Sequence, residues 1–243
     1  MKIETYTASF LVLTLTTFLT EGCKKESIET LPIPVEIAIN HNVGELPLEM
    51  DTIKYVNAAG NSFSVNRMLY YVSGFVLTEI NDTKHRMDTA FLINAEDHST
   101  MSFVLGTLPQ GEYSTISFCI GLIPELNEFG SLANTLENNA MFWPEQMGGG
   151  YHFMKLEGHY LDHDQNFSGY AMHLGTNSAQ VDITLNSNFI LDSERHTLHL
   201  EMNLLEWFQT PTTYDLNDGN YSMGNEGLMT ILSKNGSDVF TLE

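Results

Sequence analysis

Histidines close to glycines are the residues of this chain whose type and spacing could support chemistry. His152 follows three consecutive glycines, Gly148 to Gly150, and the same stretch begins with Trp143 and Pro144. The proline ring excludes the residue before it from helical conformations, so Trp143 is held extended. Glycines let the backbone turn sharply and approach another group closely. The stretch 141–155 therefore predicts a site in which a large ring and a histidine lie on either side of a bend.

Two further histidines have similar surroundings. His41 comes shortly before Gly44, and His173 shortly before Gly175, each at the expected end of a strand. Neutral imidazole is the commonest protein ligand for a metal ion. We therefore expect His41, His152 and His173 where the loops of a sheet structure meet, although each of them taken singly is more often a hydrogen-bonded or surface histidine.

Familiar catalytic and metal motifs are missing from the sequence. There is no His-Glu-x-x-His, Cys-x-x-Cys, P-loop or Rossmann glycine pattern, and no Gly-x-Ser-x-Gly nucleophile elbow. No nucleophile–base pair or acid pair is discernible, so we expect a protein that is not an enzyme. A metal site would have to gather its ligands from separate strands. Met141, Met147 and Met154 could offer thioethers to Cu(I), but methionine more often fills gaps in a core.

Short apolar runs broken by Gly, Asn and Asp predict the scaffold that positions these residues. Val35, Ile37 and Ile39 alternate with polar neighbours, which is typical of a half-buried strand. Turns recur about every 8–14 residues, which predicts an all-β fold, an antiparallel immunoglobulin-like β-sandwich with long loops. The segment 122–140 interrupts this rhythm and is expected to carry a short helix near 130–136. The segment 226–234 fits a second short helix or a terminal strand about equally well.

The N-terminal residues predict export. Lys2 precedes an apolar run, 8–20, which is too short to span a bilayer and ends close to Cys23. This resembles a bacterial lipoprotein signal, in which the chain is cut before Cys23 and that cysteine is acylated. We expect a signal peptide at 1–22, a lipid anchor and tether at 23–34, and one domain at 35–243. The protein would then be lipid-anchored in the bacterial cell envelope, at the outer membrane or a periplasm-facing membrane; a plain signal peptide is the alternative.

Charge and cysteine content narrow the possible partners. The formal net charge is −21, from 10 Lys and Arg against 31 Asp and Glu. Such an acidic chain is repelled by a phosphate backbone, so nucleic acid is not an expected partner. With Cys23 lipidated, Cys119 has no cysteine left to pair with, and its apolar surroundings predict a small buried hydrophobe.

The longest motif of the chain, WPEQMGGGYHFMKLEG at 143–158, resembles the signature of the MbnP-like copper-binding proteins. Shorter motifs follow the family's order, namely INH at 39–41, RMLYYVS at 67–73, YAMHLG at 170–175, EWF at 206–208 and SKNG at 233–236. The resemblance extends over residues 35–243. The long motif is specific, whereas the short ones carry weight only through their order.

This resemblance implies an exported β-rich protein that holds one copper ion for acquisition or storage. In the family, a partner di-haem protein of the MauG type oxidises a tryptophan to kynurenine, which binds copper together with histidines. The matching residues here are Trp143 with His41 and His173, and His152 is a further candidate. Opening the indole creates an aryl amine and a ketone, donors that tryptophan lacks, and imidazole suits copper. The alternative is a cell-surface recognition or adhesion module that binds protein or glycan, with incidental histidines.

Overall fold

The first sheet is built around β1 (Ile33–Val43), in which buried and less buried residues alternate as expected for one apolar face. In this computed structural model, Met1, residues 31–192 and residues 196–243 are described, so the expected signal peptide and Cys23 lie outside the described residues. β1 begins at Ile33, slightly before the boundary expected at 35, and Leu31–Glu243 forms one compact unit. β1 pairs with β2 (Leu46–Pro47), β7 (Ser102–Leu108) and β12 (His196–Asn203), and β12 pairs with β13 (Phe240–Leu242).

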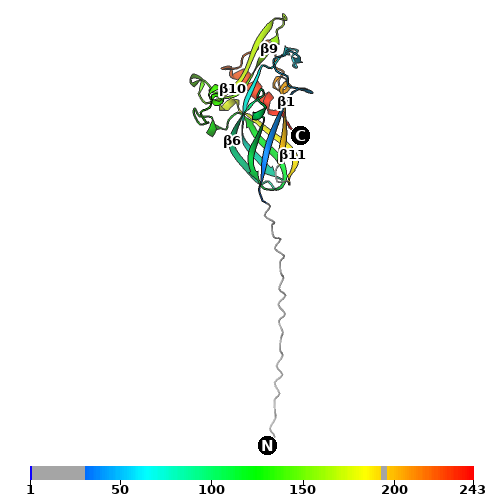
Figure 1. Ribbon diagram of the computed structural model, residues 1–243, viewed down its shortest axis with the longest axis vertical. Helices are drawn as coiled ribbons and strands as arrows, with labels where there is room; N and C mark the ends of the chain where they lie inside the picture. Colours follow the sequence, from blue (N-terminus) through cyan, green and yellow to red (C-terminus); the bar gives the residue numbers. More distant parts are fainter. Residues whose placement is uncertain (2–30, 193–195) are drawn as a thin grey trace. The chain divides into compact units, whose positions relative to one another are not determined.

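The second sheet is larger and has β5 (Arg67–Glu79) at its centre. β5 pairs antiparallel with β6 (Lys84–Asn94), β8 (Gly111–Ile120) and β9 (His152–Leu161). β9 forms a long hairpin with β10 (Phe167–Gly175), and β8 pairs with β11 (Val181–Leu191). Two short strands, β3 (Tyr55–Val56) and β4 (Ser62–Phe63), complete the sheet beside β9. Figure 1 labels four strands of this sheet, β6, β9, β10 and β11.

The two sheets pack face to face across an aromatic core, which confirms the prediction of an all-β sandwich. Phe240 of the first sheet contacts Phe118 and Tyr70 of the second, with ring centroids 5.3 and 6.3 Å apart. Cys119 is buried with a free thiol, as expected of a small hydrophobe. One difference from a purely antiparallel sandwich is the parallel pairing of β1 with β12. Parallel neighbours need a long crossover, and most of the chain lies between these two strands.

Short helices join the strands. α1 (Leu136–Ala140) begins only at the last residue of the expected span 130–136, because the side chain of Thr135 caps it by accepting a hydrogen bond from the Asn138 N–H. The segment 226–234, expected to be either a helix or a strand, is part of the helix α2 (Glu226–Asn235). Its Met229 and Leu232 are buried. Short 3₁₀ helices are η1 (His98–Thr100), η2 (Pro124–Leu126), η3 (Glu145–Met147), η4 (Asn177–Ala179), η5 (Leu204–Phe208) and η6 (Gly236–Asp238). Within the described residues, no helix combines the length and apolar character that crossing a bilayer requires.

Candidate metal centre

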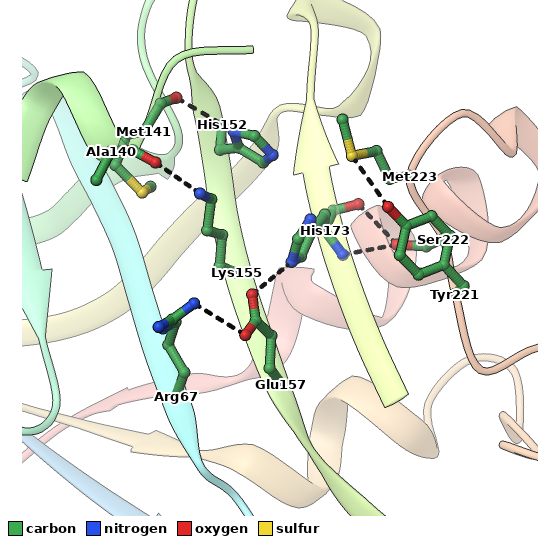
Figure 2. Close-up of polar contacts among 10 residues, drawn as sticks. All are labelled: Arg67, Ala140, Met141, His152, Lys155, Glu157, His173, Tyr221, Ser222 and Met223. Carbon is green, nitrogen blue, oxygen red and sulfur yellow. Dashed lines mark hydrogen bonds and ion pairs between the residues drawn. The ribbon is translucent and has the colours of Figure 1, made fainter. Parts of the chain in front are cut away.

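The larger sheet has a core face and an outer face, and register shows which residues occupy each. Tyr70 points into the core, because it contacts Phe240 of the other sheet. Its register partner Met154 shares that face. The next residue, Lys155, pairs with His173, so these two side chains project from the outer face. Figure 2 shows Lys155 and His173 on the same side of the β9–β10 hairpin.

The excursion between β8 and β9 delivers Trp143 to the start of this hairpin. Gly148, Gly149 and Gly150 all have positive φ, at 109°, 69° and 82°, a region that residues with a side chain rarely adopt. The bend they form is closed by two backbone hydrogen bonds, from Trp143 N–H to the Gly150 carbonyl (2.9 Å) and from His152 N–H to the Met141 carbonyl (2.6 Å). The glycine-hinged bend expected from the sequence is present, and it brings Trp143 beside His152.

Three of the four predicted ligand residues form one buried cluster. The ring centroids of Trp143 and His152 are 4.7 Å apart, and those of His152 and His173 are 5.1 Å apart. The exposed fractions of Trp143, His152 and His173 are 3%, 5% and 8%. The indole Nε1 of Trp143 donates a hydrogen bond to the Met147 carbonyl at 3.0 Å. The cluster is therefore a compact set of one indole and two imidazoles with little access to solvent.

The structure does not bring His41 into this cluster. Nε2 of His41 lies 2.9 Å from the hydroxyl of Tyr70, and the two rings meet edge to face. Because Tyr70 points into the core, His41 lies between the two sheets, whereas His173 projects from the opposite face of the larger sheet. His41 also lies inside β1, which continues to Val43, rather than at a strand end.

Burial favours the neutral form of His152 in the cluster and of His41 between the sheets. Desolvation, with smaller contributions from Lys155 and His173, lowers the pKa of His152 to about 3. Desolvation, followed by the nearby His98, lowers the pKa of His41 to about 4. A neutral imidazole keeps a lone pair on one ring nitrogen, which is the form that binds metals.

Two residues that support the cluster were not anticipated. Glu157 accepts a hydrogen bond from Nε2 of His173 at 2.8 Å and another from Nη1 of Arg67 at 3.0 Å (Figure 2). Ser222 exchanges hydrogen bonds with the main-chain N–H and carbonyl of His173, both at 2.7 Å. Side chains alternate along a strand, so the sequence could have predicted that Glu157 lies on the same face as Lys155. Ser222 lies far along the chain in an irregular segment, and no pattern pointed to it.

The donor set fits a metal that accepts few ligands. Among the described residues, no group of three or more His, Cys, Asp and Glu side chains could hold a metal ion. His173 nevertheless has a buried ring nitrogen, Nδ1, for which the described residues offer no hydrogen-bond partner. An unpaired buried polar atom costs about 1–3 kcal/mol, so a ligand at this atom would offset a real penalty. Two imidazoles and the group at position 143 are the donors at hand.

Gly175 holds Trp143 in place by being small. A Cβ built on Gly175 would lie 2.2 Å from Cε3 of Trp143, so any side chain here displaces the indole. We expect Gly175→Ala to lower the free energy of unfolding by about 1–3 kcal/mol and to change the Trp143 fluorescence. Gly169→Ala in the same strand is the control, because its Cβ would meet nothing closer than 3.9 Å. Denaturant unfolding of both variants checks this, and equal stabilities would contradict it.

Comparison with known proteins agrees with this architecture. A family model of MbnP matches residues 32–227. The solved structure of MbnP from Methylosinus trichosporium is similar with a TM-score of 0.54 at 14% sequence identity, and the alignment covers 77% of this chain and 80% of that one. A search of the curated proteins gives no match. At so low an identity the structural likeness shows the fold alone, but the family match covers most of the chain. The chain therefore belongs to the MbnP family.

Proposed function

We propose that this protein is an exported, lipid-anchored copper-binding protein that acquires or stores copper and has no enzymatic activity. The observation that carries the proposal is the buried cluster of Trp143, His152 and His173, in which an imidazole nitrogen has no partner among the described residues. His152 and His173 would hold the ion together with the oxidised side chain at position 143. His41, which the family resemblance also suggested, would stay outside this set because it lies between the two sheets, whereas His173 projects from the opposite face of the larger sheet.

The chemistry of the cluster favours copper over the hard cations. Neutral imidazoles are good ligands for Cu, whereas Mg²⁺ and Ca²⁺ prefer several oxygens. An intact indole offers its N–H only as a donor, and here that N–H is already bonded to the Met147 carbonyl. Conversion of Trp143 to kynurenine would supply an amine and a ketone in its place. Copper here would be cargo, and the protein's part is to supply a dry, preformed set of donors.

The proposal includes the partner and the location expected from the sequence. A di-haem protein of the MauG type would oxidise Trp143, which is 3% exposed. The lipid on Cys23 would keep the domain at the membrane, where exported partners and copper meet. Two or three acyl chains give stable anchoring, while a single chain binds a membrane only marginally.

Mass spectrometry and metal analysis of one sample test this function. We expect the peptide with Trp143, from cells given copper and expressing the di-haem partner, to gain about 4 Da, the arithmetic of this covalent conversion. About one copper per chain should accompany it. The peptide with Trp207, which is buried in the core, is an internal control and should keep its mass. An unmodified Trp143 without copper would reject the proposal and favour a recognition module for protein or glycan.

A further inference from the structure

Two acceptor groups beside the cluster determine which ring nitrogen of each histidine carries hydrogen. Nε2 of His173 faces Oε1 of Glu157 at 2.8 Å. An ionised carboxylate can only accept, so Nε2 of His173 must hold the proton. Nδ1 of His152 faces the main-chain carbonyl of Met141 at 3.2 Å, and a carbonyl also only accepts. In the neutral form of imidazole, which is the form that binds metals, the two histidines therefore take opposite tautomers, with lone pairs on Nδ1 of His173 and Nε2 of His152.

Glu157 is itself held in its position. Its second oxygen accepts a hydrogen bond from Nη1 of Arg67 on β5, at 3.0 Å. A glutamate carboxyl is ordinarily ionised near neutral pH, and the two hydrogen bonds from His173 and Arg67 favour this charged form. The backbone of His173 is fixed separately by Ser222. Hydrogen bonds thus hold the ring of His173 at Nε2 and its main chain at both the N–H and the carbonyl.

We propose that Glu157, anchored by Arg67, is a positioning residue that fixes His173 with hydrogen on Nε2 and presents Nδ1 as the nitrogen that binds metal. The metal half of this inference rests on the proposed function. Nδ1 of His173 is buried and has no partner among the described residues, a property that Nδ1 of His41 shares, but only the nitrogen of His173 belongs to the cluster with His152 and Trp143. A hydrogen bond from the far side of a ligating imidazole to a carboxylate orients the ring and increases its basicity.

Proton–nitrogen NMR of the metal-free protein with ¹⁵N-labelled histidine tests the positioning half. We expect a slowly exchanging Nε2–H resonance from His173 and an Nδ1–H tautomer for His152, assigned through the His173→Ala and His152→Ala variants. Glu157→Ala should abolish the Nε2–H resonance by exposing it to exchange, whereas Glu157→Gln should retain it, because an amide oxygen still accepts. Glu79→Ala is the matched control, since Glu79 accepts from His85 at 2.6 Å in a separate carboxylate–histidine pair.

Competition titration with a copper chelator tests the metal half on protein made with the di-haem partner. Glu157→Ala should lower copper affinity by about 10–100-fold, Glu157→Gln should recover part of the loss, and Glu79→Ala should bind as the wild type. If Glu157→Ala folds poorly, Arg67→Gln can replace it, because the Arg67 side chain is 49% exposed and its substitution disturbs the fold less. Arg67→Gln should also lower the copper affinity, but by a smaller factor.

The possible results separate the two ideas. An Nδ1–H tautomer at His173, or a Glu157→Ala protein that binds copper like the wild type, overturns the positioning role. If the wild-type protein shows the expected tautomers but binds no copper, the positioning by Glu157 is supported and the proposed function is overturned instead.

Discussion

Copper affinity should fall by more than about a hundredfold in His173→Ala and in His152→Ala, because each change removes a metal ligand and not merely a group that orients one. Both side chains are at least nine-tenths buried and lie in one ring cluster with Trp143. Trp143→Phe should lose binding as completely, since phenylalanine cannot be converted into a kynurenine. Chelator competition on proteins made with the di-haem partner measures all three affinities.

Two histidine variants make this prediction specific. His85→Ala is the control, because His85 lies on β6 and bonds Glu79, away from the cluster. His41→Gln decides between the structure and the family-based expectation, since glutamine can still bond the Tyr70 hydroxyl but offers no imidazole. Copper affinity within about threefold of the wild type in His41→Gln would fit a site made without His41. A loss comparable to that of His173→Ala would place His41 among the ligands and contradict the present assignment.

The sequence predicted the sandwich well, because its signals are local. The alternation at Val35, Ile37 and Ile39 produced β1 with those three side chains buried. The triple glycine predicted the bend next to Trp143, since positive φ is a property of single residues. By contrast, α1 was misplaced because its start depends on one capping side chain, Thr135, which the pattern of apolar residues does not reveal.

The site was predicted only in part, because it depends on which faces the strands present. His41 continues the alternation of Val35, Ile37 and Ile39, so the sequence already placed it in the core-facing series of β1. His173 alternates instead with Tyr170, Met172 and Leu174, which are buried. Expecting His41 and His173 to meet ignored this difference in phase. The contact of His173 with His152 follows from the β9–β10 hairpin and was expected, whereas the contact of His173 with Ser222 joins distant segments, which no local pattern could give.

The second large effect is a loss of stability in acid that originates at His41. Its pKa is lowered from 6.5 to about 4 in the folded protein, first by burial and then by His98. Between these two pH values the unfolded chain binds a proton at this residue and the folded chain does not. The free energy of unfolding therefore decreases as the pH falls from 6.5 towards 4, and His41 contributes about 2–3 kcal/mol of that decrease by pH 4.5.

Replacement of His41 by glutamine isolates this contribution. His41→Gln keeps a hydrogen-bonding partner for Tyr70 but cannot titrate, so its unfolding free energy should change less between pH 7 and pH 4.5 than that of the wild type, by about 2–3 kcal/mol. The carboxylates and His152, whose pKa is also lowered, to about 3, titrate in both proteins. Their contributions therefore cancel when the pH-dependent change in unfolding free energy is compared between the two proteins. Urea unfolding of metal-free protein at the two pH values measures it. Parallel pH profiles would mean that His41 accepts a proton within the fold, and hence that the space between the sheets is less dry than its burial indicates.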